Sequence, residues 1–92
     1  MTDRVTARHI LVESLADAMT ARERITDTGE DFADVAKQVS KCPSASQGGA
    51  LGTFGKGQMV KPFEDAAFSL PVGKVSLPVQ TQFGYHLIQR TQ

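Results

Sequence analysis

The sequence has little that would crosslink, export or anchor a small protein. Its 92 residues contain a single cysteine, Cys42, so no intramolecular disulfide can hold the fold together. A lone thiol favours a reducing compartment, and residues 1–5 contain no apolar run that could serve as a signal peptide. No stretch of about 18 apolar residues is present to span a bilayer. We therefore expect a cytoplasmic protein that does not associate with membranes.

An excess of charge of one sign is also absent. Ten lysines and arginines balance ten aspartates and glutamates, so the formal net charge is zero. Without a basic surplus the chain has little to attract a phosphate backbone, and we do not expect nucleic acid as a partner. The apolar fraction of 40% and the charged fraction of 22% are typical of a globular protein. A chain of this length accommodates one core, so residues 1–92 are expected to form a single domain.

Hydrophobic periodicity divides the chain into strands and helices. Residues 5–12 predict a strand with apolar side chains on both faces, and hence one covered on both sides. Helices are expected at 16–28, from 32 to the Cys42-Pro43 pair, and at 61–68, and further strands at 51–54, 75–80 and 85–90. The order β-α-α-β-α-β-β favours an α+β fold built on an antiparallel sheet.

Local signals refine these elements. Ser14 is a suitable N-cap for the first helix, whose expected inner stripe is Leu15, Ala18, Met19 and Ile25. The second helix has apolar residues at i, i+3, i+4 and i+7, namely Phe32, Val35, Ala36 and Val39. Residues 44–57 hold five of the eight glycines and predict flexible turns around strand 51–54. Residues 81–84 are expected to join the last two strands as a hairpin.

Both histidines lie within predicted strands, His9 in the first and His86 in the last. A histidine on an apolar strand face is commonly a structural residue hydrogen-bonded into the core. However, the terminal strands of a small α+β sheet are often neighbours, which would bring the two imidazoles together. A buried imidazole pair can share a proton and fix the tautomer of each ring, which points to a functional role.

Cys42 and three apolar residues each have a structural and a functional interpretation. A free cysteine usually behaves as a small buried hydrophobe, but Cys42 follows a helix end and would become more thiolate-like beside a histidine. Zinc binding by Cys42 and the histidines is a weak alternative, because their spacing matches no local metal motif. Leu51, Met59 and Phe63 are core residues by default, although they could also line a shallow apolar pocket at a junction of loop and helix.

Four segments together resemble the parvulin family of peptidyl-prolyl cis/trans isomerases, in its small, stand-alone, non-phospho-specific form. They are Ala-Arg-His-Ile-Leu-Val at 7–12, Gln-Gly-Gly-Ala-Leu-Gly-Thr-Phe at 47–54, the run from Gly57 to Phe68, and Thr-Gln-Phe-Gly-Tyr-His-Leu-Ile at 81–88. The resemblance implies a parvulin-like member of the FKBP-like superfold, with a four-stranded antiparallel sheet wrapped by about four helices. It also implies catalysis of rotation about Xaa-Pro bonds without a cofactor or metal.

The same resemblance implies a role for eight residues. His9 and His86 match the family's histidine pair, Thr81 matches a hydroxyl of the histidine network, and Cys42 stands where the family has Cys or Asp facing the substrate carbonyl. The positions that match the pocket for the proline ring are Leu51, Met59 and Phe63, with Phe83 at a position that varies within the family. The implied partners are proline-containing peptides and unfolded or folding proteins, bound by a monomer.

One departure from the family bears on specificity. Phospho-specific parvulins carry basic residues in a long loop after the first strand, whereas here the link is only Glu13-Ser14. We therefore expect no dependence on phosphate, and an apolar or uncharged residue before the proline. Two other functions remain open: a module that binds proline-containing segments without turnover, and a small metal- or redox-responsive protein using Cys42 with the histidines.

Overall fold

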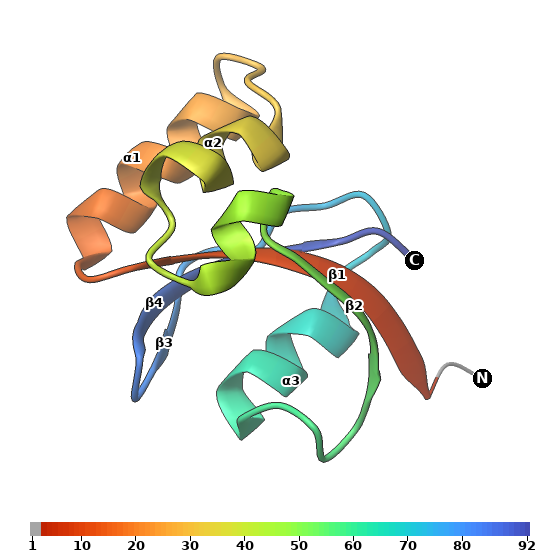
Figure 1. Cartoon of the computed structure of the whole chain (residues 1–92). Helices are drawn as coiled ribbons and strands as arrows, with labels where there is room; N and C mark the ends of the chain where they lie inside the picture. Colours follow the sequence, from red (N-terminus) through yellow and green to blue (C-terminus); the bar gives the residue numbers. More distant parts are fainter. Residues whose placement is uncertain (1–2) are drawn as a thin grey trace.

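The computed structural model describes residues 3–92 and consists of one four-stranded sheet covered by helices on both faces (Figure 1). The strands are β1 (Arg4–Val12), β2 (Ala50–Gly55), β3 (Val79–Thr81) and β4 (Gly84–Arg90), in the order β2-β1-β4-β3 with every pair antiparallel. The helices are α1 (Leu15–Thr26), α2 (Phe32–Val39), the short 3₁₀ helix η1 (Pro43–Gln47) and α3 (Lys61–Ser69). The predicted α+β class and antiparallel sheet are confirmed, with three α-helices where about four helices were expected.

The central strand β1 separates two apolar cores, as its two apolar faces predicted. Helices α1 and α2 pack over Ile10, Val12 and Leu87 on one face of the sheet. Helix α3 covers Val5, Ala7 and Ile88 on the other face (Figure 1). Both histidine rings contact Phe63 of α3, so they lie on this face as well. The last strand, β4, pairs directly with β1, so the first and last strands are neighbours as expected.

The inner face of α1 differs from the prediction. Ser14 caps the helix by accepting a hydrogen bond from the Asp17 N–H at 3.1 Å, as predicted. However, Leu15 and Met19 are 51% and 42% exposed, so their assignment to the inner stripe was wrong. The buried residues are Ala18 and Ala21, with Ile25 partly buried. Small side chains therefore make the closest contact with the core, and the larger ones lie to the side.

The predicted strand 75–80 is shorter and interrupted. A bridge joins Val75 to Gln89, and regular pairing begins only at Val79. Pro78 has no N–H to donate to a ladder, and the carbonyl of Ser76 turns to accept a hydrogen bond from Arg22 Nε at 3.0 Å. The Ser76 hydroxyl then replaces that carbonyl as acceptor for the Ile88 N–H.

Two boundaries of secondary structure near the middle of the chain also differ from the prediction. Helix α2 ends at Val39, before the Cys42-Pro43 pair. Ser40 has an extended backbone, and its hydroxyl accepts hydrogen bonds from the N–H groups of Leu11 and Cys42. Residues 44–47, predicted as part of a flexible glycine-rich turn, instead belong to η1, which has Pro43 in its first turn.

Candidate active site

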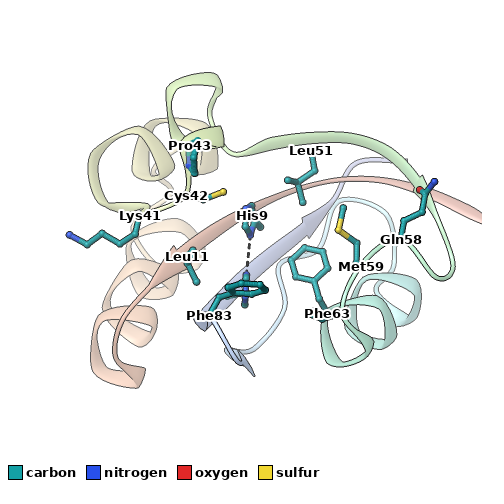
Figure 2. A pocket seen from close by; sticks show the side chains of 12 residues that line it. His9, Leu11, Lys41, Cys42, Pro43, Leu51, Gln58, Met59, Phe63 and Phe83 are labelled. Carbon is teal, nitrogen blue, oxygen red and sulfur yellow. Dashed lines mark hydrogen bonds between the residues drawn. The ribbon is translucent and has the colours of Figure 1, made fainter.

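Two buried histidines form the centre of the site. His9 and His86 come from the adjacent strands β1 and β4, and each side chain is only 5% exposed. Their Nδ1 atoms lie 3.0 Å apart, within hydrogen-bonding distance, and the ring planes are 18° from parallel (Figure 2). The sheet register thus brings together two residues that are 77 positions apart in the sequence.

Burial keeps both imidazoles uncharged near neutral pH. Desolvation, reinforced by the nearby His86, lowers the pKa of His9 from 6.5 to about 4. Desolvation also lowers the pKa of His86. Because a neutral imidazole has one N–H and one bare nitrogen, the pair can form its Nδ1–Nδ1 hydrogen bond with one ring donating and the other accepting.

Thr81 extends the network behind the pair. Its Oγ1 lies 2.7 Å from Nε2 of His86 and accepts a hydrogen bond from the Phe83 N–H at 3.1 Å. Nε2 of His9 is buried and has no hydrogen-bond partner among residues 3–92. Buried N–H groups without an acceptor are rare, which favours a His9 protonated on Nδ1. In that arrangement His9 donates to His86, and His86 Nε2–H donates to Thr81.

An apolar pocket of about 500 Å³ opens beside the histidines. The ring of Phe63 meets both histidine rings in a T-shaped arrangement, with centroids 5.5 Å from His9 and 5.2 Å from His86. Leu51 and Met59 line the same pocket from β2 and from the loop before α3 (Figure 2). Phe83 also lines it, but from the turn between β3 and β4, where its side chain is 61% exposed.

Cys42 lies at the pocket because β1 extends beyond β2. The ladder between the two strands ends near Arg8, and the chain after α2 pairs with the free edge of β1 instead. Ser40 Oγ accepts hydrogen bonds from the N–H groups of Leu11 at 3.0 Å and Cys42 at 3.4 Å. Gly49 O accepts from the His9 N–H at 2.9 Å. Cys42 is therefore attached through Ser40 to the strand that carries His9.

The loop that carries Met59 is also fixed by side chains. The buried carboxylate of Glu64 accepts a hydrogen bond from the Gly57 N–H at 2.6 Å. Gln58 Oε1 accepts one from the Gly55 N–H at 2.8 Å. These contacts hold the connection between β2 and α3, so the position of Met59 does not depend on its own packing alone.

The structure brings all eight sequence-predicted residues to one place. Seven line the pocket, while Thr81 lies behind the histidine pair and reaches the site through His86. Sequence analysis did not identify five further lining residues, which are Leu11, Lys41, Pro43, Gln58 and Val60. Four of them flank Cys42 or Met59 in the sequence, and that adjacency was the signal that could have found them. Leu11 lies two positions after His9 in the same strand, so strand alternation was the signal in its case.

A metal-binding cluster and a membrane-spanning helix are both absent from residues 3–92, the part of the chain that the structure describes. Among them, no three side chains of His, Cys, Asp or Glu are grouped so as to hold a metal ion. None of their helices combines the length and the apolar character needed to cross a membrane. The arrangement that the structure does contain is an apolar pocket next to an uncharged polar network. Such an arrangement can hold an apolar ring with a polar group beside it.

Comparison with known proteins identifies the family. Residues 7–92 match the model described as Rotamase, a PPIC-type PPIase domain. The chain is 48% identical over 86 residues to "Peptidyl-prolyl cis-trans isomerase Pin1" of Arabidopsis thaliana, covering 94% of this chain and 70% of the relative. The solution structure of NmPin, from Nitrosopumilus maritimus, superposes with a TM-score of 0.90 at 45% identity, covering 100% of this chain and 99% of that one. The chain belongs to the parvulin family of peptidyl-prolyl cis/trans isomerase domains.

Longer relatives contain the same domain. "Foldase protein PrsA" of Geobacillus sp. (strain WCH70) is 56% identical over 91 residues, which are 96% of this chain and 32% of the relative. The crystal structure of PrsA from Bacillus cereus matches with a TM-score of 0.93 at 47% identity, covering 98% of this chain and 35% of that one. The chain spans about a third of the length of these foldase relatives.

Proposed function

We propose that this protein accelerates cis/trans rotation about Xaa-Pro bonds in peptides and folding proteins. The observation that carries the proposal is that an uncharged histidine pair, with its two Nδ1 atoms 3.0 Å apart, lines an open apolar pocket. A proline ring has the size and polarity for this pocket, and its imide would then lie at the polar end. Membership of the family supports the same reaction.

The chemical demand on such a site is modest. Rotation about a peptide bond meets a barrier of about 18–20 kcal/mol, because resonance is lost as the amide twists. Acceleration by ~10⁴–10⁶ requires only about 5–8 kcal/mol of preferential binding to the twisted form. No covalent bond is broken. A pocket that desolvates the ring and tolerates a less delocalised carbonyl therefore supplies the chemistry.

We assign roles by position. Leu51, Met59 and Phe63 enclose the proline ring, and the exposed Phe83 covers it from the rim. Cys42 lines the same pocket. In the proposed complex it faces the carbonyl of the residue before proline and adjusts the electrostatics there.

The histidines and Thr81 act as a polar network and not as an acid or base. The low pKa of His9 keeps a positive charge away from the amide, and the Thr81 contact orients the His86 ring. This arrangement favours non-covalent catalysis, in which Cys42 forms no bond to the substrate.

NMR exchange spectroscopy on Ala-Xaa-Pro-Phe peptides tests the function. Catalytic amounts of protein should produce exchange cross-peaks between the cis and trans signals, because uncatalysed exchange takes tens to hundreds of seconds. Phe63→Ala should weaken them, whereas Val72→Ala, at a residue that is 60% exposed and outside the pocket, should not. Absence of cross-peaks together with shifts of the Met59 and Phe63 resonances would instead indicate a peptide-binding module.

We further propose that residues 1–92 act as one domain, as a monomer and in a reducing compartment such as the cytoplasm. All the site residues come from a single chain, so the pocket needs no second copy. The free Cys42 at the pocket favours a reducing environment. Light scattering tests the oligomeric state, and a dimer with higher activity than the monomer would contradict it. Localisation by microscopy tests the compartment.

A further inference from the structure

Among the described residues 3–92, Lys41 is the one formally charged residue that lines the apolar pocket. The others are apolar or uncharged, and the two histidines are neutral near pH 7 because their pKa values are lowered. Figure 2 shows Lys41 beside Cys42, at the end of the pocket away from Met59 and Gln58, with its side chain extending outward. The charged end of this side chain thus lies outside the space for the ring.

The backbone of Lys41 is fixed while its ammonium group is uncommitted. Its N–H donates to the Leu11 carbonyl at 2.7 Å, which attaches this residue to the end of β1. The side-chain ion pairs found within residues 3–92 engage Arg24 and Lys61, not Lys41. Lys41 also borders a second, more polar hollow that includes Asp17 and Arg24. Arg24 is already bound by Glu30 at 2.8 Å.

The position of Lys41 relative to Cys42 identifies the part of the substrate that it meets. Under the proposed function, on which this step rests, Cys42 faces the carbonyl of the residue that precedes proline. Lys41 is the adjacent residue in sequence and lies on the outer side of Cys42. In the proposed complex the side chain of that preceding residue projects away from the ring pocket, toward the side on which Lys41 lies.

We propose that Lys41 is a specificity-determining residue that favours an acidic side chain immediately before the proline. The interaction is an ion pair in water, so its contribution is modest and falls with added salt. This differs from the expectation of an uncharged residue before proline, which considered only the short Glu13-Ser14 link. Lys41, in the segment after α2, supplies a positive charge that the Glu13-Ser14 link does not have.

Glu and Gln peptides of matched shape test the inference. Exchange spectroscopy on Ala-Glu-Pro-Phe and Ala-Gln-Pro-Phe gives the ratio of their kcat/KM values, which we expect to be about two- to fivefold in favour of Glu at low salt. Lys41→Gln should bring the ratio close to one, and Lys41→Glu should invert it. Lys74→Gln removes the same charge at an exposed residue outside the pocket and should leave the ratio unchanged.

The outcomes separate this inference from the proposed function. Equal turnover of the two peptides by the unmodified protein, or a preference for Glu that persists in Lys41→Gln, would overturn the inference alone. Absence of turnover of either peptide would overturn the proposed function together with it. A Glu preference that disappears in Lys41→Gln and weakens as salt is raised would establish the role of Lys41.

Discussion

Acid should unfold this protein through its buried histidine pair. The pKa of His9 is lowered from 6.5 to about 4, so the folded protein takes up this proton only well below the pH at which the unfolded chain does. Between those values the unfolded chain binds more protons. The free energy of unfolding therefore falls as the pH drops through about 6.5, and the loss is complete near pH 4.

The size of the effect follows from the same two values. A pKa lowered from 6.5 to about 4 corresponds to roughly 3 kcal/mol of stability at neutral pH. His86 adds to this loss, because burial lowers its pKa as well. Small domains have a free energy of unfolding of about 5–15 kcal/mol, so protonation of the pair can remove a large part of it.

Urea unfolding at several pH values between 8 and 4, followed by circular dichroism, measures the loss. His9→Asn removes the titrating group, so the difference between the two proteins cancels the carboxylates that also titrate in this range. The unmodified protein should lose roughly 3 kcal/mol more than the variant across the interval. Ring signals of His9 that titrate near 6.5 in the folded protein, or equal pH slopes for the two proteins, would refute the reasoning.

Three substitutions test other contacts of the site. Thr81→Val removes the hydroxyl that contacts His86, so isomerase activity should fall and the free energy of unfolding should drop by about 1–3 kcal/mol. Thr81→Ser should restore both, and a Val variant with unchanged activity and stability would show that Thr81 is not part of the histidine network. Glu64→Ala leaves the Gly57 N–H without its acceptor, so the KM for peptide should rise and the stability to urea should fall. Glu64→Gln should restore most of the KM and of the stability, whereas an unchanged KM in Glu64→Ala would show that Glu64 does not position the pocket. Cys42→Asp should retain much of the activity in the exchange assay, and a near-total loss with an intact fold would favour a covalent mechanism.

Local sequence signals predicted the elements whose causes are local. The periodicity of Phe32, Val35 and Ala36 identified α2, and all three side chains are buried. The strand pattern placed His9 in the first strand and His86 in the last, and both residues lie there. The prediction failed where a serine hydroxyl accepts a hydrogen bond from a strand N–H in place of a backbone carbonyl, as Ser40 and Ser76 do. Hydrophobic periodicity does not show which backbone N–H such a hydroxyl will bind.

The location of the site follows from a difference in strand length that the sequence does not show. Strand β1 runs to Val12, but its pairing with β2 ends near Arg8, which leaves backbone groups at the end of β1 to be satisfied by other residues. The segment from Ser40 to Gly49 provides those partners, and in doing so it carries Cys42 to His9. Gly49 must approach so closely that a Cβ would collide with the His9 carbonyl. The glycine there allows both the pairing and the pocket, so Gly49→Ala should disturb the His9–His86 contact before it disturbs α1 or α2.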